Sequence, residues 1–184
     1  MQSVETLYGA LPQDIYTALS QVRLFVCDID GVFSDGRIYL GNQGEELKAF
    51  HTRDGFGFKA LQRIGIKTAV ITGRESKIVE QRMRSLNTNF IIQGQENKAQ
   101  ALQDILTSTQ LAPEQVAAIG DDVPDLGLFA LSAVPIAVAD AHPLVLKQAR
   151  WITSSRGGFG AVREVCDVLL QIHGHLDDIT GASV

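Results

Sequence analysis

Residues 22–36 read VRLFVCDIDGVFSDG, a short apolar run that ends in two aspartates, Asp28 and Asp30. A run this short, rich in β-branched and aromatic residues, is typical of a buried strand. Two carboxylates one residue apart repel each other, and one would stay protonated unless a bound cation compensates them. Gly31 then lets the backbone leave the strand. The pattern indicates a metal-dependent site at the carboxyl end of a sheet strand, where open α/β sheets bind ligands.

The composition is that of an ordinary soluble globular protein. The chain has 184 residues, of which 45% are hydrophobic and 20% charged, so one domain spanning 1–184 is expected. A net charge of -5 disfavours nucleic acid and anionic membranes as partners. A membrane-spanning run and a signal peptide are both missing from the pattern, so a cytoplasmic protein is expected. Cys27 and Cys166 lie in apolar segments and are interpreted as buried, reduced thiols.

Strands alternate with helices along the chain, which predicts a doubly wound, mostly parallel, Rossmann-like α/β sheet. The expected strands are 22–27, 67–71, 90–92, 115–119, 134–138 and 151–153. The expected helices are 12–20, 57–64, 76–86, 98–107 and 143–150, with a last one after residue 160. Two extended runs around a Gly/Asn turn predict a β-hairpin within 37–50. The polar tail, 173–184, is expected to be mobile.

Further polar residues fall where other elements should meet the same sheet edge. Thr72 ends a strand, Lys98 begins a helix, and Asp121 and Asp122 follow a strand. Each alone is weak, because a lysine is usually solvated and an acidic pair often caps a helix. Together with Asp28-Ile29-Asp30-Gly31, in this order and each at an element boundary, they favour a functional site.

This order resembles that of the haloacid dehalogenase-like phosphohydrolases. The resemblance implies that Asp28 attacks phosphorus and forms an aspartyl-phosphate. Asp30 would protonate the leaving alkoxide and later deprotonate the attacking water. Thr72 would donate hydrogen bonds to the phosphoryl oxygens, and Lys98 would offset charge on them and on Asp28. These four residues are the expected catalytic set, and Thr72, Arg74 and Lys98 are the expected substrate-binding residues.

The resemblance also implies a bound Mg²⁺, which prefers oxygen ligands. The expected ligands are the Asp28 carboxylate, the Asp30 backbone carbonyl and Asp121. Asp122 would complete the metal site by supporting the waters of the ion.

The spacing of these motifs leaves no room for a cap domain. Only 41 residues separate Asp30 from Thr72, and only 25 separate Thr72 from Lys98. The site is therefore open unless another chain covers it, and an open site binds small substrates poorly. The hairpin at 37–50 is too apolar and too small to stand alone in water. It either folds onto its own domain or forms a subunit contact, and the second interpretation is preferred.

Longer motifs narrow the resemblance. DIDGVFSDG (28–36), FHTRDG (50–55), ITGRES (71–76), QGQENK (93–98), GDD (120–122) and GGFGAVRE (157–164) are similar to those of the capless 3-deoxy-D-manno-octulosonate 8-phosphate phosphatases. This implies a phosphatase of lipopolysaccharide precursor synthesis. It also implies a homotetramer whose hairpins meet around a central axis, so that neighbouring subunits help to close each site.

Two alternatives stay open at this point. Related nonulosonate 9-phosphate phosphatases share the motif set, as does the phosphatase-like domain of cytidylyl-sialic-acid synthetases, so the sugar is not determined. A non-catalytic regulatory or oligomerisation module of the same fold is the alternative from another class. A receiver domain is disfavoured, because its phosphoacceptor aspartate lies on a later strand than its acidic pair.

Several other residues have two interpretations. Arg74 either holds a sugar carboxylate through two parallel hydrogen bonds or is a surface arginine at a helix start. Arg53 and Asp54 either line the mouth of the site or pair with each other. Residues 157–160 either bind an anion through backbone N–H groups or form a simple turn, which is preferred. The histidines are interpreted as structural or solvated: His51, His142, His173 and His175.

Overall fold

The computed structural model describes residues 2–178, and residues 1 and 179–184 lie outside the described part. Its centre is a six-stranded sheet in the order β10-β9-β8-β3-β6-β7, in which all paired strands are parallel. The strands are β3 (Leu24–Cys27), β6 (Lys67–Ile71), β7 (Phe90–Ile92), β8 (Val116–Gly120), β9 (Val134–Ala137) and β10 (Trp151–Ile152). The predicted doubly wound α/β fold is confirmed.

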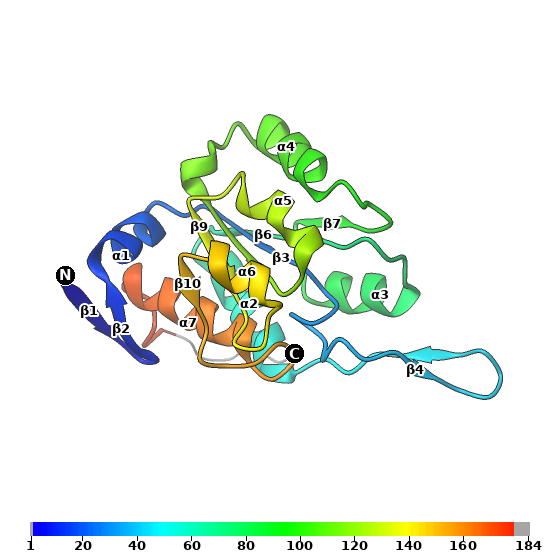
Figure 1. The fold of residues 1–184 in the computed structure, drawn as a ribbon. Coiled ribbons are helices and arrows are strands. Elements are labelled where there is room, and N and C mark those ends of the chain that lie inside the picture. The colour runs from blue at the N-terminus through cyan, green and yellow to red at the C-terminus, as the bar shows by residue number, and fades with distance from the viewer. Residues whose placement is uncertain (1, 179–184) are drawn as a thin grey trace.

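Helices cover both faces of the sheet (Figure 1). The helices are α1 (Gln13–Ser20), α2 (Thr52–Arg63), α3 (Lys77–Ser85), α4 (Lys98–Thr109), α5 (Leu126–Phe129), α6 (Pro143–Gln148) and α7 (Ala161–Ile172). On one face α7 packs against α2 and α1, and on the other α4 packs against α5. Because both faces of the sheet are covered, its central strands read as continuous apolar runs rather than as alternating patterns.

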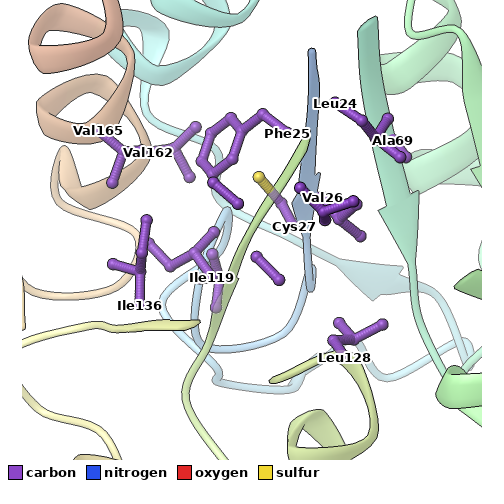
Figure 2. Packing of buried hydrophobic residues seen from close by; sticks show 14 of the residues in the cluster. Leu24, Phe25, Val26, Cys27, Ala69, Ile119, Leu128, Ile136, Val162 and Val165 are labelled. Atoms are coloured by element: carbon purple, nitrogen blue, oxygen red, sulfur yellow. The ribbon is translucent and has the colours of Figure 1, made fainter. Parts of the chain in front are cut away.

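Strand β3 is the middle of this core. Phe25 and Cys27 point toward Val162 and Val165 of α7, whereas Val26 points to the opposite face (Figure 2). The Phe25 ring meets the Phe58 ring of α2 edge-on, with centroids 6.0 Å apart. Cys27 and Cys166 are buried free thiols, as predicted. Since all the strands of this six-stranded sheet run parallel, the residues that follow β3, β6 and β8 meet at one edge of it.

Helix α2 is longer than predicted, because it begins at Thr52 rather than near residue 57. The His51 imidazole accepts a hydrogen bond from the Arg53 backbone N–H and so caps the helix start. Two glycines in the first turns lower the helix propensity and hide the start from a pattern search. One of them, Gly57, is required by packing, since a Cβ there would crowd the Cys166 side chain of α7.

A second small hairpin, at the N-terminus, was not predicted. Strands β1 (Ser3–Thr6) and β2 (Gly9–Pro12) pair antiparallel ahead of α1. The Tyr8 hydroxyl donates to Asp167 Oδ2 at 2.8 Å, and the Gln171 amide donates to the Glu5 carbonyl at 3.2 Å. Polar contacts thus fasten the hairpin to α7. Its two strands are short and show no periodic apolar pattern, so the sequence did not indicate them.

The predicted hairpin within 37–50 is present. Strands β4 (Tyr39–Leu40) and β5 (Glu46–Leu47) pair antiparallel and project from the body of the molecule (Figure 1). Apart from this hairpin, the described chain between β3 and β6 holds only loops and α2, and no cap domain lies there. Within residues 2–178, no helix has the length and apolar character needed to cross a bilayer.

Residues 173–178 form turns after α7, in which the His175 ring contacts the Asp178 carboxylate at 3.0 Å. The expected mobile tail extends to residue 184, and its last six residues lie outside the described part.

Candidate active site

A cavity of about 540 Å³ opens at the carboxyl ends of β3, β6 and β8. It is lined by Asp28, Asp30, Gly36, Thr72, Gly73, Arg74, Glu96, Lys98, Asp121, Asp122, Pro124 and Asp125. Every residue that the sequence analysis selected as catalytic, substrate-binding or metal-binding is in this set. The parallel sheet therefore brings together positions that are up to 94 residues apart in the chain.

Asp28 and Thr72 occupy equivalent places on neighbouring strands. The Asp28 backbone N–H donates to the Ile119 carbonyl at 3.1 Å, and that of Thr72 donates to the Ile92 carbonyl at 3.0 Å. These bonds continue the strand pairing by one residue and hold both backbones at the sheet edge. Both side chains are buried, so each is held in a defined position beside the cavity.

Lys98 reaches the site from the first turn of α4. The Asn97 side chain accepts from the Gln100 backbone N–H at 3.1 Å, which sets the start of the helix. The buried Lys98 Nζ lies 2.6 Å from Asp28 Oδ1 and 2.6 Å from Asp125 Oδ1. Burial disfavours the charged ammonium, but the two carboxylates outweigh it and raise the pKa of Lys98 above its usual value.

Asp125 is a site residue that the sequence analysis left without a role. Its Oδ1 accepts from Lys98, and its Oδ2 accepts from the backbone N–H groups of Asp121 at 2.9 Å and Asp122 at 3.2 Å. Both oxygens therefore have donors, and Asp125 orients the lysine and the acidic loop. The signal that could have revealed it is the spacing of Asp122 and Asp125, which matches a capping box.

The acids of this site carry more negative charge than the lysine can compensate. Carboxylate oxygens of Asp28, Asp121 and Asp125 lie within 4.8 Å of one another, and Lys98 supplies one positive charge to the three. Burial raises the pKa of Asp28 to about 7 and that of Asp121 to about 8, and neighbouring carboxylates add to both shifts. A divalent cation fits beside Asp28 and Asp121, because it would neutralise the excess charge of the cluster and prefers oxygen ligands.

Asp122 is placed differently from Asp121. Its carboxylate accepts from the Val123 backbone N–H at 2.7 Å and caps a short 3-10 turn, Val123–Asp125. The side chain is on the exposed rim of the cavity, outside the group formed by the other three acids. The support that Asp122 is expected to give to the waters of the ion stays a prediction, whereas its capping bond is part of the structure.

Asp30 turns toward the β4–β5 hairpin. Its Oδ1 accepts from Lys48 Nζ and, at 3.4 Å, from the Ser34 hydroxyl. Sequence reasoning missed Lys48, since nothing in the local pattern separates it from a solvated lysine. Gly31 follows with φ +94°, and a Cβ at that position would overlap the Asp121 carboxylate. A glycine is thus required for the loop after β3 to approach the acidic loop after β8.

The structure gives the contacts of the three residues that had two interpretations, Arg74, Arg53 and Asp54. Arg74 lines the cavity, and its Nη2 donates to Glu46 Oε2 at 2.8 Å. Neither interpretation of Arg53 and Asp54 is seen in the described residues, where neither side chain lines the cavity and the two form no ion pair with each other. Arg53 contacts His51, and Asp54 is buried below α7, where Oδ1 accepts from the Arg163 backbone N–H at 2.8 Å. Burial raises the pKa of Asp54 to about 6.

The glycine-rich segment 157–160 is a packing turn, as preferred. The Gly158 N–H donates to the Val32 carbonyl at 2.8 Å, and the Gly157 N–H donates to Asp140 Oδ1 at 3.0 Å. These N–H groups are used within the protein and hold the loop after β3 in place. His51 and His142 accept from backbone N–H groups at the starts of α2 and α6, which confirms their structural interpretation.

Comparison with known proteins agrees with this geometry. A model of the haloacid dehalogenase-like hydrolase family matches residues 89–164. The 3-deoxy-D-manno-octulosonate 8-phosphate phosphatase KdsC of Yersinia pestis is 47% identical over 181 residues, which are 98% of this chain and 97% of the relative. A crystal structure of the Yersinia pestis phosphatase superposes with a TM-score of 0.96 at 46% identity, covering 100% of this chain and 99% of that one.

A second relative was solved with ligands. The 3-deoxy-D-manno-octulosonate 8-phosphate phosphatase of Moraxella catarrhalis, in complex with a magnesium ion, a phosphate ion and a KDO molecule, superposes with a TM-score of 0.88. It is 38% identical, and the match covers 91% of this chain and 97% of that chain.

The sheet, the acid–lysine cluster and these matches define a haloacid dehalogenase-like hydrolase. Within that superfamily, the chain belongs to the 3-deoxy-D-manno-octulosonate 8-phosphate phosphatase family, and it is a phosphoric monoester hydrolase.

Proposed function

We propose that this enzyme removes phosphate from 3-deoxy-D-manno-octulosonate 8-phosphate, as a step of lipopolysaccharide precursor synthesis in the cytoplasm. The observation that carries the proposal is the Lys98 ammonium, which joins Asp28 and Asp125 beside Thr72 in a cavity open to solvent. The choice of sugar is supported by the near full-length identity to relatives with that name and by the KDO molecule in the Moraxella structure.

The proposed chemistry divides the hydrolysis into two steps. An oxygen of Asp28 attacks phosphorus and forms an aspartyl-phosphate, while Asp30 protonates the departing sugar oxygen. Asp30 then deprotonates the water that cleaves the aspartyl-phosphate. Lys98 holds Asp28 by its Oδ1 and offsets phosphoryl charge, and the buried Thr72 hydroxyl donates to a phosphoryl oxygen.

The metal in this proposal is Mg²⁺, held by the Asp28 carboxylate, the Asp30 backbone carbonyl and Asp121. When bound, it screens the charge between the anionic nucleophile and the anionic phosphate. Asp125 is not assigned as a ligand, because donors within the protein already occupy both of its oxygens.

The acidic cluster predicts that stabilisation by Mg²⁺ depends on pH. In the unfolded chain these carboxyls have ordinary pKa values near 3.8, whereas in the folded protein Asp28 has a pKa of about 7 and Asp121 one of about 8. Raised values mean that the metal-free folded state binds more protons, so its stability falls as pH rises from about 4 toward 8. A cation that replaces these protons relieves that loss.

The rise in melting temperature on adding saturating MgCl₂ is therefore expected to be larger at pH 8 than at pH 6. Asp54 also has a raised pKa, but it is not among the residues that line the cavity, so its effect cancels in the comparison with and without metal. Asp121→Asn is the matched variant, and it should lose most of the Mg²⁺ effect at both pH values. An equal rise at pH 6 and pH 8 in the unmodified protein would contradict the assignment of the acids.

Phosphate release from a panel of sugar-acid phosphates, with Mg²⁺ and with EDTA, tests the proposed substrate. The 8-phosphate of 3-deoxy-D-manno-octulosonate should have the highest kcat/KM, and EDTA should abolish its turnover. A higher kcat/KM for a nonulosonate 9-phosphate would contradict the proposed substrate, but it would leave the proposed two-step chemistry unchanged. Failure to hydrolyse any phosphate monoester would favour a non-catalytic module.

We further propose that the β4–β5 hairpin is the assembly surface of a homotetramer. Its apolar side chains are exposed, with Leu40 at 72%, Leu47 at 61% and Ile38 at 53% of their full accessibility. A projecting apolar hairpin of this size needs a covering surface in water. A neighbouring subunit is the proposed cover, and it would also enclose the open cavity.

The double variant Leu40→Ser, Leu47→Ser is expected to shift the protein from tetramer to smaller species in light scattering after gel filtration. The matched control is Leu144→Ser, which removes an exposed leucine of α6 away from the hairpin. KM for the sugar phosphate should rise in the double variant, because the site would lose its cover. An unmodified protein that is monomeric at all concentrations would refute the assembly.

A further inference from the structure

Lys48 places a buried ammonium beside the proposed acid–base residue. Its Nζ bonds Asp30 Oδ1 and lies 3.4 Å from Glu46 Oε1, and its side chain is only 1% exposed. A lysine buried to this degree requires charged or polar partners. Lys48 belongs to the chain segment that leaves β5, so the hairpin delivers this ammonium to the loop after β3.

The side-chain hydrogen bonds of Asp30 that the structure shows are all accepted by one carboxylate oxygen, Oδ1. Lys48 Nζ and, more weakly, the Ser34 hydroxyl at 3.4 Å both donate to Oδ1. An ammonium has only donors, so it keeps Oδ1 as an acceptor. The proton that Asp30 exchanges with the substrate must then be carried on Oδ2. Asp30 lines the cavity and Lys48 does not, so Lys48 acts on the reaction through its ion-pair partners, of which Asp30 is the one that it bonds directly.

We propose that Lys48 is a positioning residue, which holds Asp30 so that Oδ2 faces the oxygen of the leaving group. This inference rests on the proposed phosphatase function. As the bond from Asp28 to phosphorus forms, the bond from phosphorus to the sugar oxygen breaks, and its electron pair goes to that oxygen. The proton of Asp30 Oδ2 joins the sugar oxygen. Water then attacks phosphorus and gives a proton to Asp30, while the bond from phosphorus to Asp28 breaks and its electron pair returns to the Asp28 carboxylate. The products are the free sugar and inorganic phosphate.

The same ion pairs extend to the cavity wall. Glu46 lies between Lys48 and Arg74, whose Nη2 donates to Glu46 Oε2 at 2.8 Å. The hairpin therefore connects the acid–base residue with an arginine that faces the substrate space. A displaced hairpin would move both groups, which gives it a role in the site of its own subunit.

The test compares two leaving groups in one variant. Lys48→Met removes the ammonium and keeps most of the side-chain volume. For the sugar phosphate, whose alkoxide must be protonated, kcat/KM should fall roughly 10- to 100-fold. For p-nitrophenyl phosphate, whose phenolate leaves without a proton, kcat/KM should stay within about threefold of the unmodified enzyme. Lys48→Arg should restore part of the lost activity, and KM should change little in both variants.

The matched control is Lys67→Met, which removes an exposed lysine at the opposite, amino-terminal edge of the sheet. An equal fall for both leaving groups would overturn the inference in favour of a general structural role. A rise in KM with unchanged kcat would instead make Lys48 a substrate contact. If Lys48→Met does not fold, Lys48→Gln is used for the same comparison of leaving groups.

The unmodified enzyme separates the two proposals. If it hydrolyses neither ester, the proposed function fails and this inference fails with it. If it hydrolyses both, and Lys48→Met keeps full activity on the sugar phosphate, only the positioning role is overturned.

Discussion

Asp28→Asn is expected to lower kcat by about 10⁴-fold or more on every phosphate monoester that the unmodified enzyme hydrolyses. The amide keeps the shape of the side chain but has no nucleophilic oxygen. The second step of the proposed reaction is lost as well, because no acyl-phosphate forms. Asp125 cannot substitute, since its carboxylate already bonds Lys98 and the backbone N–H groups of Asp121 and Asp122.

The fold should tolerate this change. Burial already raises the pKa of Asp28 to about 7, so a neutral group at this position removes repulsion from the other acids. Lys98 keeps Asp125 as its partner at 2.6 Å. Melting temperature should therefore stay close to that of the unmodified protein. Asp104→Asn, an exposed acid on α4, is the matched control and should keep full activity. Turnover by Asp28→Asn within about tenfold of the unmodified enzyme would place the nucleophile elsewhere.

Lys98→Met is expected to lower kcat/KM by roughly 10²- to 10³-fold, because the phosphoryl group loses a preorganised positive charge. It should also destabilise the metal-free protein. Three clustered carboxylates would lose their shared ammonium, and removal of one partner from a buried ion pair costs about 3–5 kcal/mol. The two effects arise from one group, which both holds Asp28 and neutralises the loop.

Urea denaturation with and without Mg²⁺ separates these effects. The variant should gain more stability from Mg²⁺ than the unmodified protein does, since the cation would then be the main compensating charge. Activity should stay low at saturating Mg²⁺, because the metal cannot take the place of the ammonium between Asp28 and Asp125. Lys67→Met provides the control for removing a lysine. A Lys98→Met protein with unchanged stability and unchanged kcat/KM would contradict both roles.

Much of the fold could be predicted because its causes are local. The buried strands are short apolar runs bounded by polar or glycine-containing turns, and β6 and β7 were predicted with the bounds that the structure gives. Asp28, Thr72, Lys98 and Asp121 all lie at element boundaries, and parallel strands must bring such positions to one edge. The position of the site can therefore be predicted from the order and direction of the strands alone.

The remaining features depend on contacts between distant segments. Lys48 looks like a solvated lysine until the hairpin folds back onto Asp30, and Asp54 looks like a loop acid until α7 covers it. Asp125 gains its role only when α4 brings Lys98 against it. The N-terminal strands are held by polar contacts to α7 and carry no periodic pattern. Such tertiary contacts override local propensity, which is all that a pattern in the sequence can express.

Rapid acid quenching during turnover tests the central claim, a phosphorylated Asp28, most directly. The quenched enzyme is reduced with borohydride, which converts an aspartyl-phosphate into an alcohol, and the altered residue is located by peptide mass spectrometry. Acetyl phosphate and Asp30→Asn provide a second arm, because a good leaving group loads the nucleophile and the missing base delays its hydrolysis. The account predicts a single reduced residue, Asp28, in both arms. Reduction at another acid, or turnover in both arms with no reduced residue, would contradict it.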